Sequence, residues 1–144
     1  MAVFPSLDWF SQVRDVYNSD GFQHSGGGGA CDTMAGFKVN GQDYVIVFEG
    51  LKCADIRTAA TAEMQACDFI IEMPFELWQG MVANVQEHGR ADGAYTLNSI
   101  DLQQDQSIAF SPVDDQYKQD LFYRYNQNFQ DFFNASARVK TTFA

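Results

Sequence analysis

The chain has 144 residues, of which 46% are hydrophobic and 19% are charged. This composition predicts one folded domain over residues 1–144 and excludes a disordered chain. The formal net charge is −10, with nine Lys and Arg residues scattered from Arg14 to Lys140. We therefore expect no binding to nucleic acid or to anionic membrane surfaces, because both need clustered basic side chains.

The three cysteines, Cys31, Cys53 and Cys67, are well separated and form no C-x-x-C pair. Their number and spacing argue against a disulfide framework, a zinc site or a dithiol redox site. The start of the chain has no basic segment followed by an apolar one, and no apolar run reaches about 18 residues. We expect a cytoplasmic protein with reduced thiols, no integral membrane segment, no metal and no cofactor.

The first predicted element is an amphipathic helix that begins near Ser6 and ends near Asn18, because apolar residues recur there at intervals of three and four. The run SGGGGA follows at residues 25–30. It predicts a mobile loop, since a phosphate-binding loop needs a following helix and usually a nearby Lys. Here the next Lys is Lys38, and it lies in a segment with the pattern of a strand.

Residues 32–50 predict an antiparallel hairpin, because Asn40-Gly41 separates two runs rich in β-branched and aromatic residues. Residues 51–65 are ambiguous, and we expect a third strand with a loop. The apolar run at residues 67–74 predicts a short strand that ends at Pro74.

A helix is expected from Phe75 to about Glu87, and Gly89 ends it. Residues 91–102 alternate in a way that predicts a further strand. Residues 114–136 predict the longest amphipathic helix, with Tyr and Phe on one side and Arg124, Gln127 and Gln130 mostly on the other. Because the hairpin strands must be antiparallel, the order of elements gives an α+β fold class.

Candidates for acid and base chemistry are few. The two histidines are His24, beside the glycine run, and His88, whose place at a helix end is also explained by the helix dipole. Glu49, Asp68 and Glu72 lie within or beside apolar strands. A carboxyl group in an apolar pocket would have a raised pKa and could act as an acid or base. Each of the three could equally lie on the solvent face of its strand.

Aromatic residues make up 15% of the chain and include thirteen Phe. Such an excess is typical both of well-packed cores and of ligand pockets. The aromatic side of the last helix could pack on the sheet, cap a cavity or contact a second subunit.

The run ACDFIIEMPFELWQGMVANVQEHGRADGAYTL, which begins at Ala66, resembles the core of the sterol carrier protein type-2 (SCP-2-like) family. The matching pieces are Ala66 with Asp68, Phe69 to Glu72, the helix Phe75 to Val85 with its internal Gly80, and Ala91 to Leu97. The opening helix and the hairpin agree with the family's order of elements, so the resemblance covers about residues 6–102.

This resemblance implies a curved, mainly antiparallel sheet of about five strands, covered by helices over a hydrophobic tunnel with the C-terminal helix near its mouth. The tunnel residues that it implies are Val45, Val47, Phe69, Ile71, Trp78, Met81, Val82, Phe129 and Phe133.

Three functional hypotheses follow. The first is binding of an apolar small molecule, such as a sterol, an acyl chain or a polycyclic or aromatic metabolite, in a hydrophobic pocket. The second is a cofactor-independent isomerase, cyclase or hydrolase that uses Glu49, Asp68, Glu72 or His88 as acid or base. The third is a homodimer or interaction subunit that uses the C-terminal aromatic helix.

Overall fold

The structure is a computed structural model, and it describes residues 2–22 and 30–144. His24 and most of the glycine run lie outside the described residues, so the expectation of a loop at residues 25–30 is not tested there.

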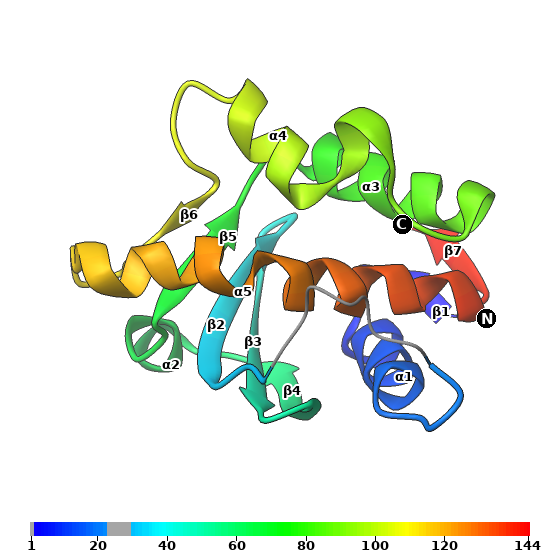
Figure 1. Ribbon diagram of the computed structural model, residues 1–144, viewed down its shortest axis with the longest axis horizontal. Coiled ribbons are helices and arrows are strands. Elements are labelled where there is room, and N and C mark those ends of the chain that lie inside the picture. The colour runs from blue at the N-terminus through cyan, green and yellow to red at the C-terminus, as the bar shows by residue number, and fades with distance from the viewer. Residues whose placement is uncertain (1, 23–29) are drawn as a thin grey trace.

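A mixed five-stranded sheet forms the centre of the molecule (Figure 1), in the order β4-β3-β2-β5-β6. Its strands are β2 (Thr33–Val39), β3 (Gln42–Glu49), β4 (Lys52–Thr58), β5 (Phe69–Glu72) and β6 (Ala109–Phe110). Strands β2 and β5 are parallel, and the other three pairs are antiparallel. The α+β class and the mainly antiparallel sheet of five strands are therefore confirmed.

The hairpin forms as predicted. Val39 pairs with Gln42 across the turn, and Asn40 and Gly41 have φ angles of 50° and 80°. These left-handed values are what a tight two-residue hairpin turn requires, and Asn and Gly adopt them at the lowest cost.

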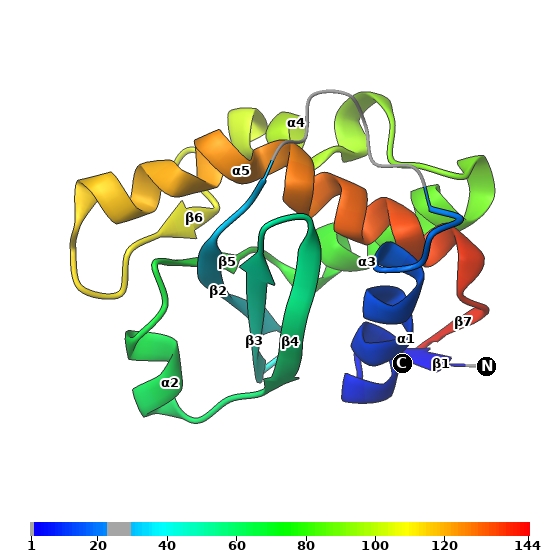
Figure 2. The same ribbon diagram turned by 60° about the horizontal axis from the view of Figure 1, so that its bottom comes forward.

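Helices cover one face of the sheet. They are α1 (Leu7–Tyr17), α3 (Phe75–His88) and α5 (Gln116–Asn134), which runs across the strands in Figures 1 and 2. The core beneath them is largely aromatic: Phe37, Phe48 and Phe69 from the strands face Phe129 and other rings of α5. The phenylalanines of α5 therefore pack in the core, whereas Tyr117 and Tyr123 of the same helix are exposed.

The opposite face carries a smaller cluster beneath α2 (Thr61–Gln65). Val45, Met64, Cys67 and Ile70 are its buried members. Gly36 makes this contact possible, because a Cβ at that position would lie 2.6 Å from Cε of Met64. The segment 51–65 thus contains the expected strand, followed by the short helix α2 in place of the expected loop.

The prediction of a strand over residues 91–102 was wrong. The segment forms a 3₁₀ turn, η1 (Gly93–Tyr95), and the helix α4 (Leu97–Gln103), and β6 supplies the fifth strand instead. The Oγ1 of Thr96 accepts a hydrogen bond from the backbone N–H of Ser99, at 3.1 Å. This N-cap selects the helix over an extended chain, and it places Leu97 and Ile100 on one buried side.

The two ends of the chain pair with each other. Strand β1 (Ala2–Phe4) lies parallel to β7 (Thr141–Phe143), which follows the 3₁₀ turn η2 (Ala135–Arg138). Trp9 Nε1 donates a hydrogen bond to Oγ1 of Thr141, at 2.9 Å. Strands β1 and β7 therefore lie side by side in Figure 2.

Candidate functional site

The residues implied as a tunnel lining do not share one open space. Seven of them have no exposed surface and lie in the main core, namely Phe69, Ile71, Trp78, Met81, Val82, Phe129 and Phe133. The centroids of the Phe69 and Phe129 rings are 5.3 Å apart, and those of Trp78 and Phe133 are 5.6 Å apart. Side chains therefore fill the space between these residues in this conformation.

Val45 and Val47 belong to the smaller cluster on the other face of the sheet. Alternation along β3 explains the separation, since Tyr44, Ile46 and Phe48 point to the main core instead. The structure thus divides the nine implied residues between two faces.

The four acid or base candidates lie apart. Glu49 is exposed at the end of β3, and His88 is exposed at the end of α3, with Nε2 3.9 Å from Oε2 of Glu87. Oδ2 of Asp68 accepts hydrogen bonds from the Thr33 hydroxyl and the Met34 N–H. Glu72 is exposed on β5 and lines two polar pockets. The structure therefore does not gather these groups into one site, and their role in catalysis stays a prediction.

An apolar pocket of about 240 Å³ lies between α3 and the η1–α4 segment. Leu77 and Gly80 line it from α3, and Ala94, Tyr95 and Ile100 line it from the other side. Glu76, Gln103 and Gln104 complete the lining with polar groups. An apolar interior with a few polar groups is the usual character of a small-molecule site.

The Tyr95 wall lies close to Gly80 of α3. A Cβ at residue 80 would lie 3.5 Å from Cε1 of Tyr95, so the Tyr95 ring lies against the helix where α3 has no side chain. The Tyr95 side chain is 47% exposed, whereas Ile100 is 3% exposed and forms the buried end of the pocket. The pocket is therefore bounded by a buried residue at one end and by a partly exposed ring at one side.

Two side chains of α5 form hydrogen bonds with the segment that contains Tyr95. Oε1 of Gln130 accepts a hydrogen bond from the Leu97 N–H at 2.7 Å, and Oδ1 of Asn134 accepts one from the Ala91 N–H at 3.0 Å. Gln130 is 5% exposed, although the sequence placed it on the polar side of the helix. These amide groups satisfy backbone donors that burial would otherwise leave unpaired.

The same amides line a larger pocket of about 500 Å³ beside Phe22 and the end of α3. Its lining is mostly polar and includes Arg90, Asp92, Gln127 and Asp131. Among its polar residues, Gln130 and Asn134 bond to the backbone of Leu97 and Ala91 and to each other.

Sequence reasoning missed the apolar pocket because one of its walls was assigned to a strand. The signals were present: Thr96 can cap a helix, and Leu97 and Ile100 have helical spacing. On α3, the implied residues Trp78, Met81 and Val82 define the core side, while Leu77 and Gly80 on the adjacent side line the pocket.

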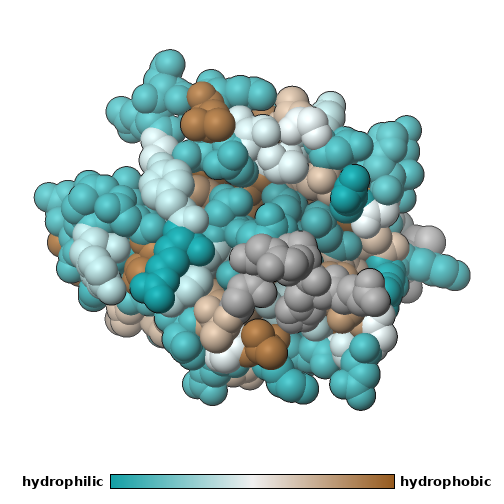
Figure 3. Space-filling view, in the orientation of Figure 1, coloured by the Kyte–Doolittle hydropathy of each residue, from teal (hydrophilic) through white to brown (hydrophobic). Residues whose placement is uncertain are grey.

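Figure 3 shows one face of the molecule as largely hydrophilic, with isolated apolar residues. In residues 2–22 and 30–144, no helix is both long enough and apolar enough to cross a membrane. Within that same part of the chain, no group of three or more His, Cys, Asp or Glu side chains is arranged to hold a metal ion.

The fold is similar to that of a known protein. The crystal structure of sterol carrier protein 2 superposes with a TM-score of 0.57 at 16% sequence identity, covering 94% of this chain and 98% of that chain. No family model matches the sequence, and no curated protein sequence matches it. The chain therefore has an SCP-2-like α+β fold, as the sequence resemblance predicted.

Proposed function

We propose that this protein binds an apolar small molecule in the pocket between α3 and the η1–α4 segment. The observation that carries the proposal is the pocket itself, whose apolar walls come from Leu77, Tyr95 and Ile100. The similarity to sterol carrier protein 2 supports a ligand of this general kind.

The volume restricts the size of the ligand. A cavity of about 150 Å³ with apolar walls holds a molecule such as benzene, and sites for drug-sized ligands begin at about 300 Å³. At about 240 Å³, the pocket has room for a short alkyl chain or a small aromatic molecule. A whole sterol would require the pocket to widen, for which the exposed Tyr95 ring is the movable wall.

The expected affinity is modest. A ligand such as 1-octanol has about nine heavy atoms, and about 0.5 kcal/mol per atom gives a binding free energy near −4.5 kcal/mol. This corresponds to a Kd of roughly 0.5 mM.

Substitution of Gly80 provides the test. In Gly80→Leu the new side chain occupies the pocket or displaces Tyr95, while the helix gains propensity because Gly is the weaker helix former by about 1 kcal/mol. We expect octanol binding, measured by calorimetry, to weaken at least tenfold with no loss of thermal stability. Ala62→Leu adds a comparable side chain at an exposed position of α2, on the other face of the sheet, and serves as the matched control. Equal octanol binding by both variants would rule the pocket out.

A further inference from the structure

The charged and polar groups that line the apolar pocket include an acid and no base. This composition restricts the polar end of the ligand, provided that the proposed function holds. The eight described lining residues include one charged side chain, the Glu76 carboxylate, and none of them is Lys, Arg or His. Gln103 and Gln104 add amide groups that can accept or donate a hydrogen bond. A polar end of the ligand would therefore meet an anion and two neutral amides.

The parts of the chain around the pocket are also rich in acidic residues. From residue 58 to residue 117, the part that supplies both walls of the pocket, the sequence contains one Arg and no Lys. It contains ten acidic residues: Glu63, Asp68, Glu72, Glu76, Glu87, Asp92, Asp101, Asp105, Asp114 and Asp115. The one Arg, Arg90, is exposed and lines the larger polar pocket instead. The part of the chain that forms the pocket walls therefore carries a net negative charge.

We infer that the pocket selects ligands whose polar end is a neutral or cationic hydrogen-bond donor, such as an alcohol or an amine, over ligands that end in a carboxylate. A hydroxyl or ammonium group can donate to the Glu76 carboxylate. A carboxylate at the same place would lie beside a like charge with no lining cation to offset it. Because Glu76 is exposed, water weakens this repulsion, and we expect a preference of about tenfold.

The test uses three ligands with the same eight-carbon chain: 1-octanol, octylamine and octanoate. Their Kd values are measured by calorimetry at neutral pH and low salt. We expect octanoate to bind about tenfold more weakly than octanol, and octylamine at least as tightly as octanol. Glu76→Gln should reduce the ratio of the octanoate Kd to the octylamine Kd several-fold. Glu76→Lys should make octanoate bind more tightly than octylamine.

Glu87→Gln is the matched control, because it removes the same charge from the same helix at an exposed position outside the pocket. An equal effect of Glu87→Gln and Glu76→Gln would overturn the assignment to Glu76. Equal binding of the three ligands, or tightest binding of octanoate, would overturn the selectivity while leaving the pocket in place. If none of the three binds, the proposed function fails, and the selectivity fails with it.

Discussion

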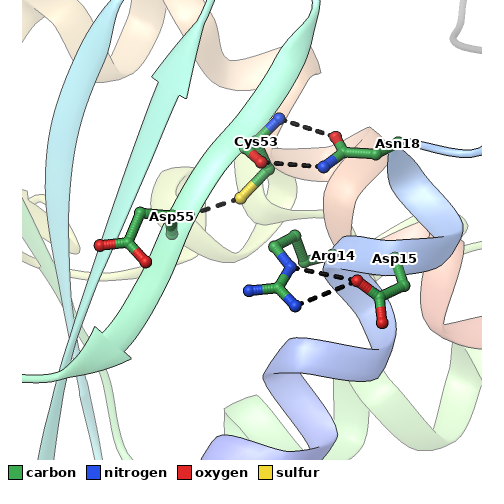
Figure 4. A network of polar contacts seen from close by, with 5 residues as sticks. All are labelled: Arg14, Asp15, Asn18, Cys53 and Asp55. Atoms are coloured by element: carbon green, nitrogen blue, oxygen red, sulfur yellow. Dashed lines mark hydrogen bonds and ion pairs between the residues drawn. The ribbon is translucent and has the colours of Figure 1, made fainter.

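The side chain of Asn18 forms two hydrogen bonds with the backbone of Cys53, as Figure 4 shows. Oδ1 accepts from the Cys53 N–H at 2.8 Å, and Nδ2 donates to the Cys53 carbonyl at 2.9 Å. Cys53 lies in β4, the edge strand of the sheet. The amide therefore supplies the bonds that a neighbouring strand would provide, and it joins the end of α1 to the sheet edge.

Removal of this amide should destabilise the protein. Asn18→Ala leaves a partly buried N–H and C=O without these partners, and we expect the free energy of unfolding to fall by about 1–3 kcal/mol. Urea denaturation measures the change. Asn98→Ala removes an exposed Asn from α4 and should change stability by less than about 0.5 kcal/mol. Equal effects of the two substitutions would show that the edge contact contributes nothing.

Asp101 organises the connection from α4 to β6. Its carboxylate accepts hydrogen bonds from Ser107 Oγ, the Ile108 N–H and the Tyr123 hydroxyl, at 2.9 to 3.1 Å, and the residue is 7% exposed. We expect Asp101→Ala to lower stability by about 3 kcal/mol, because a buried N–H loses a charged acceptor. Thermal unfolding provides the measurement. The exposed Asp105→Ala is the control, and similar melting temperatures for the two variants would contradict this role.

The cysteines should resist alkylation in the folded protein. Burial raises the pKa of Cys31, Cys53 and Cys67 to about 12 each, so few thiolates exist at pH 8. Treatment with iodoacetamide at that pH, followed by mass spectrometry, should show slow labelling in buffer and three rapid additions in denaturant. Rapid native labelling of any of the three would contradict the buried environment assigned to it.

The raised pKa values of the three thiols also predict how stability changes at alkaline pH. The unfolded thiols lose their protons near pH 9, whereas the folded thiols keep them to about pH 12. Between these values the folded state binds more protons, so the free energy of unfolding falls as pH rises. Denaturation at pH 8 and pH 10 should show this decrease, and replacing Cys31 by Ala should reduce it. If the free energy of unfolding of Cys31→Ala falls as much between pH 8 and pH 10 as that of the unaltered protein, the Cys31 thiol does not contribute to this decrease.

Enlarging the pocket should change its preference for ligand length. Ile100→Ala removes a side chain from the buried end, at an expected cost of about 2–4 kcal/mol of stability. The longer cavity should bind 1-decanol more tightly relative to 1-octanol than the unaltered protein does. Calorimetry of both alcohols, below the unfolding temperature of the variant, gives the ratio. An unchanged ratio would indicate that Ile100 does not bound the ligand.

Local signals in the sequence predicted much of the fold. Asn40-Gly41 determined the hairpin, and the apolar spacing of Phe122, Phe129 and Phe133 determined α5 and its buried side. Long-range contacts explain what was missed. Strands β1 and β7 pair residues from opposite ends of the chain. The two-residue strand β6 is defined by its pairing with β5. Gln130 is buried because Leu97, 33 residues earlier, needs an acceptor.

The candidate site was harder to predict than the fold, because a pocket depends on side chains that fail to fill a space. The family resemblance implied a tunnel, yet the aromatic residues assigned to it pack against one another. The pocket lies instead where Gly80 has no side chain and Tyr95 covers part of the gap. Gly80 lies in α3 and Tyr95 lies in η1, the turn before α4. The sequence pattern had assigned Tyr95 to a strand.

The most direct test of the central claim is a titration with 1-octanol, followed by NMR of protein labelled at its methyl groups and aromatic rings. The pocket predicts saturable shifts of the Leu77 and Ile100 methyl groups and the Tyr95 ring with one common Kd, while the Ile71 methyl in the main core stays unchanged. Shifts centred on Ile71 and the Phe129 ring would place the ligand between α5 and the sheet instead. The absence of any saturable shift would contradict the proposed function.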